Sequence, residues 1–234
     1  MNRNFINSGM MLATVLGAAV VVASAPAHAF SFTLEGSDNV GSNPLKVLVD
    51  ITQLGGNIQY KVDILPETVN STNNIGDLRG FFFDVADESL LSLLKIVNSS
   101  RAIYNETFSA NNVINLGQGV NFNPDPGKPA VARFDAGFRI GENGTGVKGA
   151  DDIRSIMFEV ARTDGLALSL SDFDRKVLRV GVRATSVGPE DGVRGGSSGK
   201  IVGEVPTPAL LPGLIGLGVA ALRKKQENEV AEEV

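Results

Sequence analysis

The chain contains no cysteine and no tryptophan, and only one histidine, His28, among its 234 residues. Without cysteine the protein has no disulfide, thiolate metal site, iron–sulfur cluster or cysteine nucleophile. His28 lies in a segment that we expect to be removed, which leaves the mature protein without an imidazole. Ser-His-Asp and Cys-His catalysis, histidine-ligated zinc and a histidine general base are then excluded. We therefore expect a protein that is not an enzyme, with no catalytic residue.

The amino terminus has the three parts of a secretory signal peptide. Arg3 supplies a positive charge, an apolar run covers about 10–25, and Ala27-His28-Ala29 is a small-residue cleavage site. The run is short and rich in small residues for a membrane span, which needs about 20 apolar residues. A retained membrane anchor is the alternative. We predict that the export machinery and signal peptidase process 1–29, so that cleavage after Ala29 makes Phe30 the first residue.

The carboxyl-terminal region has a second apolar segment, within PTPALLPGLIGLGVAALRKK at 206–225. The apolar residues 209–222 follow a Pro-Thr-Pro break and are closed by Arg223, Lys224 and Lys225. As a helix this run would span about 21 Å, which is short for a bilayer. The basic cluster would remain cytoplasmic under the positive-inside rule, with the body of the protein outside the inner membrane. A buried carboxyl-terminal helix of the domain is the alternative.

The order of break, Gly-rich apolar segment and basic stop in 206–225 resembles the PEP-CTERM class of bacterial sorting signals, in its Pro-Thr-Pro-Ala (PTPA-CTERM) variant. The resemblance implies recognition by an exosortase-like sorting enzyme, with Pro206, Thr207 and Pro208 as the sorting motif. It also implies association with the cell surface and the exopolysaccharide matrix. An acidic tail, 226–234, follows the basic stop and contains four Glu residues.

Period-two alternation dominates the body of the chain and predicts an all-β fold. Residues 45–52 and 58–64 alternate apolar with mostly polar side chains, and Gly55-Gly56 between them indicates a hairpin. Residues 88–96 could form a helical turn or two. We expect an antiparallel β-sandwich or jelly-roll-like domain over 30–191, then a Gly-rich linker or last edge strand over 192–205. The signal helix and a short apolar helix would flank this body. The other predicted strands are 30–35, 78–85, 101–108, 112–116, 131–140, 153–160, 166–170 and 177–187.

One motif occurs twice, 75 residues apart. DLRGFFFDVA at 77–86 aligns without gaps with DIRSIMFEVA at 152–161. Both segments predict a strand that begins at an Asp-x-Arg corner. The Arg guanidinium of such a corner can donate two hydrogen bonds to a carboxylate or to loop carbonyls. We interpret Asp77, Arg79, Asp152 and Arg154 as structural residues of two similar sheet motifs packed face to face. A ligand site is the alternative.

Acidic residues are the only dense chemical feature of the body. Asp84, Asp87 and Glu88 are candidate calcium ligands, because calcium takes oxygen ligands from loop carboxylates, although no EF-hand loop is present. Solvated loop acids are the alternative, and then there is no cofactor. The body has 17 basic and 22 acidic residues without a basic patch, so nucleic acid is not an expected partner.

Three functions follow from these features. The first is an exported, non-enzymatic cell-surface or matrix protein, sorted through its carboxyl terminus and associated with exopolysaccharide. The second is a calcium- or glycan-binding extracellular module. The third is a carboxylate-pair glycoside hydrolase, which needs no histidine.

Overall fold

Strands with alternating apolar residues form a five-stranded antiparallel sheet, in the order β1-β2-β3-β9-β6. The computed structural model describes residues 29–37, 43–69, 72–123, 132–141, 152–173, 179–192, 194 and 197–205. The predicted hairpin is confirmed, because β2 and β3 pair across Gly55, whose φ of 58° suits a glycine at this turn. The strands of this sheet are β1 (Ala29–Ser37), β2 (Pro44–Leu54), β3 (Asn57–Leu65), β9 (Ser155–Arg162) and β6 (Leu94–Val97).

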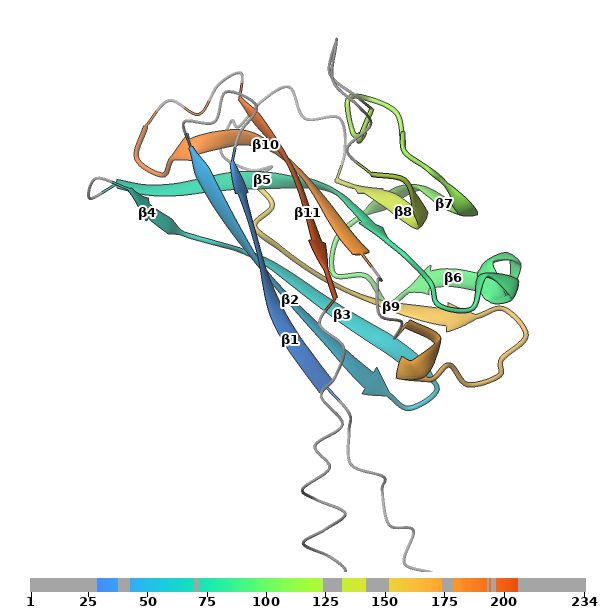
Figure 1. Cartoon of the computed structure of the whole chain (residues 1–234). Coiled ribbons are helices and arrows are strands. Elements are labelled where there is room, and N and C mark those ends of the chain that lie inside the picture. Colours follow the sequence, from blue (N-terminus) through green and yellow to red (C-terminus); the bar gives the residue numbers. More distant parts are fainter. Residues whose placement is uncertain are drawn as a thin grey trace, which may run out of the picture.

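A second antiparallel sheet of six strands packs against the first, so the all-β sandwich is confirmed (Figure 1). Its strand order is β11-β10-β5-β8-β7, and the short β4 pairs with β5. β5 and β8 are buried along almost their whole length, because both of their faces are covered. The strands are β11 (Ser198–Glu204), β10 (Arg179–Pro189), β5 (Thr72–Phe83), β8 (Phe134–Ile140), β7 (Ile103–Val113) and β4 (Glu67–Val69).

Aromatic rings fill the space between the sheets. Tyr60 stacks on Phe158 with ring centroids 5.1 Å apart, and Phe138 meets Phe158 edge-on at 4.7 Å. Phe81 and Phe83 join the same core from β5. Since the chain has no cystine, this close-packed interior is the main source of its stability.

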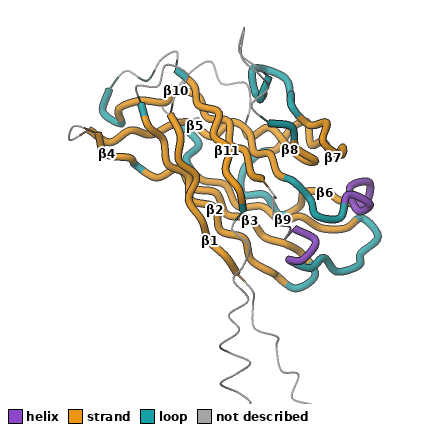
Figure 2. The backbone as a smooth tube through the Cα atoms, viewed as in Figure 1, coloured by secondary structure: helices purple, strands orange, loops and turns teal. Residues whose placement is uncertain are grey.

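The middle ring of Phe81-Phe82-Phe83 points to the other face of its sheet, as the alternation requires. There Phe82 belongs to a separate outer cluster, which is covered by the segment 114–122 that follows β7. We call this segment the flap; Figure 2 shows it as loop. The outer cluster consists of Phe82, Val113, Leu116, Val120, Phe122, Ala132 and Phe134.

The first and last strands of the sandwich, β1 and β11, are the edges of different sheets and lie against each other. A Cβ on Gly36 would lie 2.9 Å from Ile201, and Gly199 lies beside Ser37, so the two strands run in opposite directions. The start of β1 and the end of β11 therefore share one end of the molecule, which Figure 1 shows at the bottom. We call this end the base. It also holds the β2–β3 turn.

Several predicted elements differ from the structure. Residues 166–170 are not a strand but a loop that leads into the 3₁₀ helix η2 (Leu170–Phe173). The helical prediction for 88–96 holds only for the 3₁₀ helix η1 (Glu88–Leu93), after which β6 begins. The two predicted strands 101–108 and 112–116 are one strand, β7, interrupted by register shifts. Within 192–205, Ser198–Glu204 forms the edge strand β11, so the sandwich extends beyond 191.

The predicted signal helix and carboxyl-terminal helix lie outside the described residues. Across the part of the chain that the structure describes, no helix has the length and apolar character needed to cross a membrane.

Candidate functional site

The backbone of Asp152–Arg154, just before β9, connects the two sheets. Ile153 donates its N–H to Asp77 Oδ1 at 3.0 Å and accepts from Leu78 N–H at 2.7 Å, which fixes it to β5. The next carbonyl, of Arg154, accepts from Ile64 N–H of β3 at 2.8 Å. Because β3 and β5 belong to different sheets, this segment joins both layers of the sandwich through main-chain polar groups.

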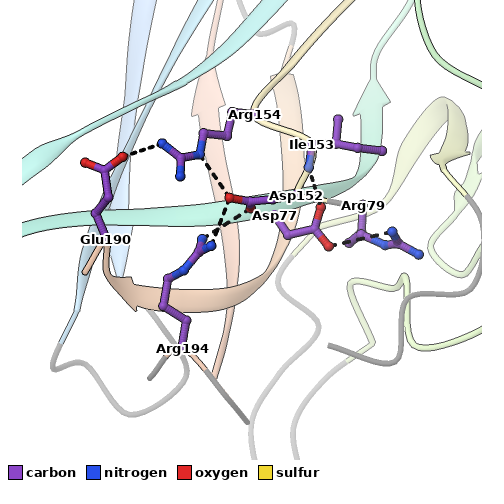
Figure 3. A network of polar contacts seen from close by, with 7 residues as sticks. All are labelled: Asp77, Arg79, Asp152, Ile153, Arg154, Glu190 and Arg194. Atoms are coloured by element: carbon purple, nitrogen blue, oxygen red, sulfur yellow. Dashed lines mark hydrogen bonds and ion pairs between the residues drawn. The ribbon is translucent and has the colours of Figure 1, made fainter. Parts of the chain in front are cut away.

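Charged side chains surround this connection (Figure 3). Asp152 accepts from both terminal nitrogens of Arg194, at 2.8 and 3.2 Å, and from Arg154 Nε at 3.0 Å. Arg154 Nη1 also reaches Glu190 at 2.5 Å. Burial opposes ionisation of Asp152, but the hydrogen bonds from Arg194 and Arg154 outweigh it and hold its pKa below the ordinary value.

Asp77 and Arg79 are the inner part of the same network. They are 3% and 5% exposed, and Arg79 Nη1 lies 3.6 Å from Asp77 Oδ2. Burial raises the pKa of Asp77 to about 6, against the opposite effects of the Ile153 N–H and Arg79. A buried carboxylate with a main-chain donor and a guanidinium partner serves a structural purpose here, because it fixes Ile153 between the sheets.

All four residues of the repeated motif thus meet in one network, and the two motif segments lie in different sheets. One detail of the prediction is wrong: Asp77 and Arg79 do not precede their strand but lie inside β5, which begins at Thr72 because β4 extends its pairing. Arg79 is the extra residue of a bulge against β10, between the pairs Gly80–Arg183 and Leu78–Ala184. Sequence reasoning missed Arg194, which stands in a Gly-rich stretch without a local pattern.

The three candidate calcium ligands have separate partners. Asp84 binds Arg179 Nε at 2.8 Å, Asp87 accepts from Ser89 N–H at the start of η1, and Glu88 accepts from Asn111 Nδ2 at 3.3 Å. Burial raises the pKa of Asp84, although Arg179 acts in the opposite direction. Among the described residues, no group of three His, Cys, Asp or Glu side chains is placed to hold a metal ion.

A hollow of about 320 Å³ lies on the outer face of β1, β2 and β3. Its outward-pointing side chains come from neighbouring register positions: Ser31 pairs with Asp50, which pairs with Lys61, and Thr52 pairs with Gln59. Ser31 Oγ donates to Asp50 Oδ1 at 2.5 Å, and Lys61 Nζ lies 2.7 Å from Asp63. These hydroxyl, amide, carboxylate and ammonium groups, beside Ala29 and Phe30, can exchange hydrogen bonds with a ligand rich in hydroxyl groups. The alternation of β2 and β3 could have indicated their outward direction, but not the hollow.

Most of the predicted processing residues lie outside the described part of the chain. Ala29 and Phe30 are the first two residues of β1. The remaining residues of this group are Ala27, Pro206, Thr207, Pro208, Arg223, Lys224 and Lys225.

No family model matches this chain, and no curated protein matches it significantly. A solved structure to which it is similar is the KRT10-binding region domain of the pneumococcal serine-rich repeat protein PsrP. The similarity covers 76% of this chain and 98% of that chain, at 14% sequence identity and a TM-score of 0.27.

Proposed function

We propose that this chain is an exported, non-enzymatic cell-surface or extracellular-matrix protein, sorted through its carboxyl-terminal segment. The observation that supports this most directly is where the described strands lie. They run from Ala29 to Glu204. Apart from Ala29, they lie between the predicted cleavage point and Pro206, where the predicted sorting signal begins. The sandwich thus occupies the interval between two segments with the composition of export and sorting signals.

The route follows from the two segments. The export machinery delivers the body across the inner membrane, and signal peptidase removes 1–29. The apolar residues 209–222 hold the carboxyl end in the membrane, with Arg223, Lys224 and Lys225 on the cytoplasmic side. An exosortase-like enzyme then acts near Pro206–Pro208, and the body joins the surface or the exopolysaccharide matrix.

The test is to fractionate cells that produce the chain with and without residues 206–234, and to measure the mass of the mature form. We expect the mature form to begin at Phe30. The full-length gene product should appear in the membrane or surface fraction, whereas the truncated product should be released. Identical distribution of the two forms would refute sorting by the carboxyl terminus, and an intact Met1 peptide in the exported fraction would refute cleavage.

A second candidate function, glycan binding by the body, is favoured by the hollow on β1–β3. Its polar lining suits a polyhydroxylated ligand, and the apolar Phe30, the expected first residue of the mature form, borders it. Affinity electrophoresis in gels that contain dextran or alginate tests this role. Retardation that is lost in Gln59→Ala and kept in Thr33→Ala, a β1 substitution outside the hollow's lining, would support it. Equal mobility with and without polysaccharide would exclude both polymers as ligands.

A further inference from the structure

The base of the sandwich exposes apolar side chains. Of the described residues, three large hydrophobic side chains are substantially exposed, and two of them, Leu54 at 47% and Leu166 at 62%, are at this end. Leu54 ends β2 at the β2–β3 turn, and Leu166 lies in the loop after β9. The turn and the loop are in contact, because Leu168 donates its N–H to Gly56 O at 2.9 Å and Ala167 lies beside Gly56. Isolated exposed leucines are common on protein surfaces, but here two of them flank the contact between this turn and this loop, and we call them the apolar patch of the base.

The opposite end of the sandwich is charged. Lys46 pairs with Glu35 and Glu67 there, and Arg154 pairs with Glu190. Asp191 is exposed in the turn that follows β10. The base also carries charge, because Arg162 pairs with Asp164 two residues before Leu166 and Glu204 is exposed at the end of β11. Of the described residues, however, the exposed leucines lie at the base, where β1 begins and β11 ends.

The distance from the base to the apolar segment of the tail is short. Only Pro206, Thr207 and Pro208 separate Val205 from Ala209, where the apolar run begins. Even fully extended, these steps span at most about 14 Å. β2 runs from the charged end to the base over 11 residues, or about 35 Å. A tail inserted in a bilayer would thus keep the base near the lipid and the charged end far from it.

We infer that the base is a membrane-facing surface, whose Leu54 and Leu166 side chains enter the interfacial region of the bilayer while the tail is inserted. This inference rests on the anchoring step of the proposed function. The partner is the lipid surface itself, recognised by the transfer of the two leucine side chains out of water. The body would therefore be held upright on the membrane, with its charged end outward, until the chain is processed.

The absence of tryptophan makes a direct test simple, because one introduced tryptophan is the only indole in the protein. Leu166→Trp places it at the base, and Asp191→Trp is the matched control at the charged end. Each variant, as the chain from Phe30 to Val234, is reconstituted into phosphatidylcholine vesicles with and without brominated acyl chains, and vesicle flotation is measured in parallel. We expect bromine to quench the tryptophan at 166 several-fold more strongly than the tryptophan at 191. Combining Leu54→Ser with Leu166→Trp should reduce that quenching.

The outcomes separate this inference from the anchoring on which it rests. If the chain floats with the vesicles but both tryptophans are quenched equally, or neither is quenched, the membrane-facing base is refuted and the anchor stands. If the chain does not float, the anchoring is refuted, and the inference with it. Thermal unfolding like that of the parent shows that each variant is folded before it is compared.

Discussion

At the scale of single residues, the buried carboxylate of Asp77 makes stability depend on pH. Its pKa is about 6 in the folded protein, against an ordinary value near 4 in the unfolded chain. Between these values the folded protein binds more protons than the unfolded chain, so the contribution of Asp77 to stability is complete below about pH 4. It falls as the pH rises toward 6 and is constant above that. The loss corresponds to roughly 2–3 kcal/mol.

Asp77→Asn should remove this dependence. Asn keeps an oxygen that can accept the Ile153 N–H, but it does not titrate. We expect the unfolding free energy of the parent, minus that of the variant, to fall by about 2–3 kcal/mol between pH 4 and 6.5. Urea unfolding at several pH values measures this difference, in which the titration of other groups largely cancels. A difference that is independent of pH would show that Asp77 has an ordinary pKa.

The two arginines of the repeated motif should not be equivalent. Arg79→Ala leaves the buried Asp77 without its cation, which we expect to cost about 2–4 kcal/mol. Arg154 has a side chain 40% exposed, and Asp152 keeps Arg194 when Arg154 is lost. Arg154→Ala should therefore cost less than about 1 kcal/mol. Chemical denaturation of the two variants compares them, and equal costs would contradict the division into inner and outer parts of the network.

At the scale of elements, three adjacent strands each place a glycine beneath the outer cluster: Gly181 of β10, Gly80 of β5 and Gly137 of β8. A Cβ on Gly181 would lie 2.5 Å from Phe134 and 2.9 Å from Phe122, and one on Gly80 would overlap Val120 of the flap. Arg183 Nε also donates to the flap at Gly119 O, at 3.2 Å. Because these three glycines have no side chains, the flap can pack closely on the outer face of the sheet.

Gly181→Ala should disturb the packing of the flap and destabilise the protein by about 1–3 kcal/mol, because the rings of Phe134 and Phe122 must move. The matched control is Gly56→Ala, where the nearest atoms lie 3.5 Å from the added Cβ and φ is not positive. We expect the control to change stability by less than about 1 kcal/mol. Thermal unfolding compares the two variants. A neutral Gly181→Ala would mean that the flap does not pack closely on β10.

The sequence predicts the elements well where a strand is amphipathic and a turn is short. It fails where another element supplies the hydrogen bonds. Leu166, Leu168 and Leu170 alternate like a strand, yet Gln53 binds both Leu168 O and Leu170 N–H, so this segment closes the base as a loop. The sequence predicts two strands at 101–108 and 112–116, whereas the structure has the single strand β7. Within β7, Asn105 and Asn111 adopt positive φ and interrupt the pairing with β8.

For the candidate sites too, the sequence identifies residues but does not predict how they are arranged in space. The 75-residue repeat identifies Asp77, Arg79, Asp152 and Arg154, because a shared motif leaves a signal in the sequence. The hydrogen bonds between the two copies, and the contribution of Arg194, depend on how the sheets pack. Similarly, alternation places Asp50 and Lys61 on one face of a hairpin, but the hollow forms only where β1 joins them.

At the scale of the whole molecule, the sandwich closes where its first and last strands meet. Ile201 of β11 is 1% exposed and belongs to the same core cluster as Leu34 of β1. β11 also covers one side of β10 through seven paired positions. Residues 198–204 are therefore part of the core structure and not a connection to the tail, although their Gly-rich sequence allows either interpretation.

A pair of truncations tests this boundary. A chain that ends at Val205 keeps β11 and should unfold cooperatively, with a midpoint close to that of the full chain. A chain that ends at Ser197 loses Ile201 and the pairing partner of β10. This uncovers apolar core residues, makes β10 an edge strand and leaves the edge strand β1 without the strand that lies against it. We expect it to unfold at a much lower temperature or to aggregate. Circular dichroism melts compare the two, and equal midpoints would show that β11 adds nothing to the core and that the domain ends near residue 191.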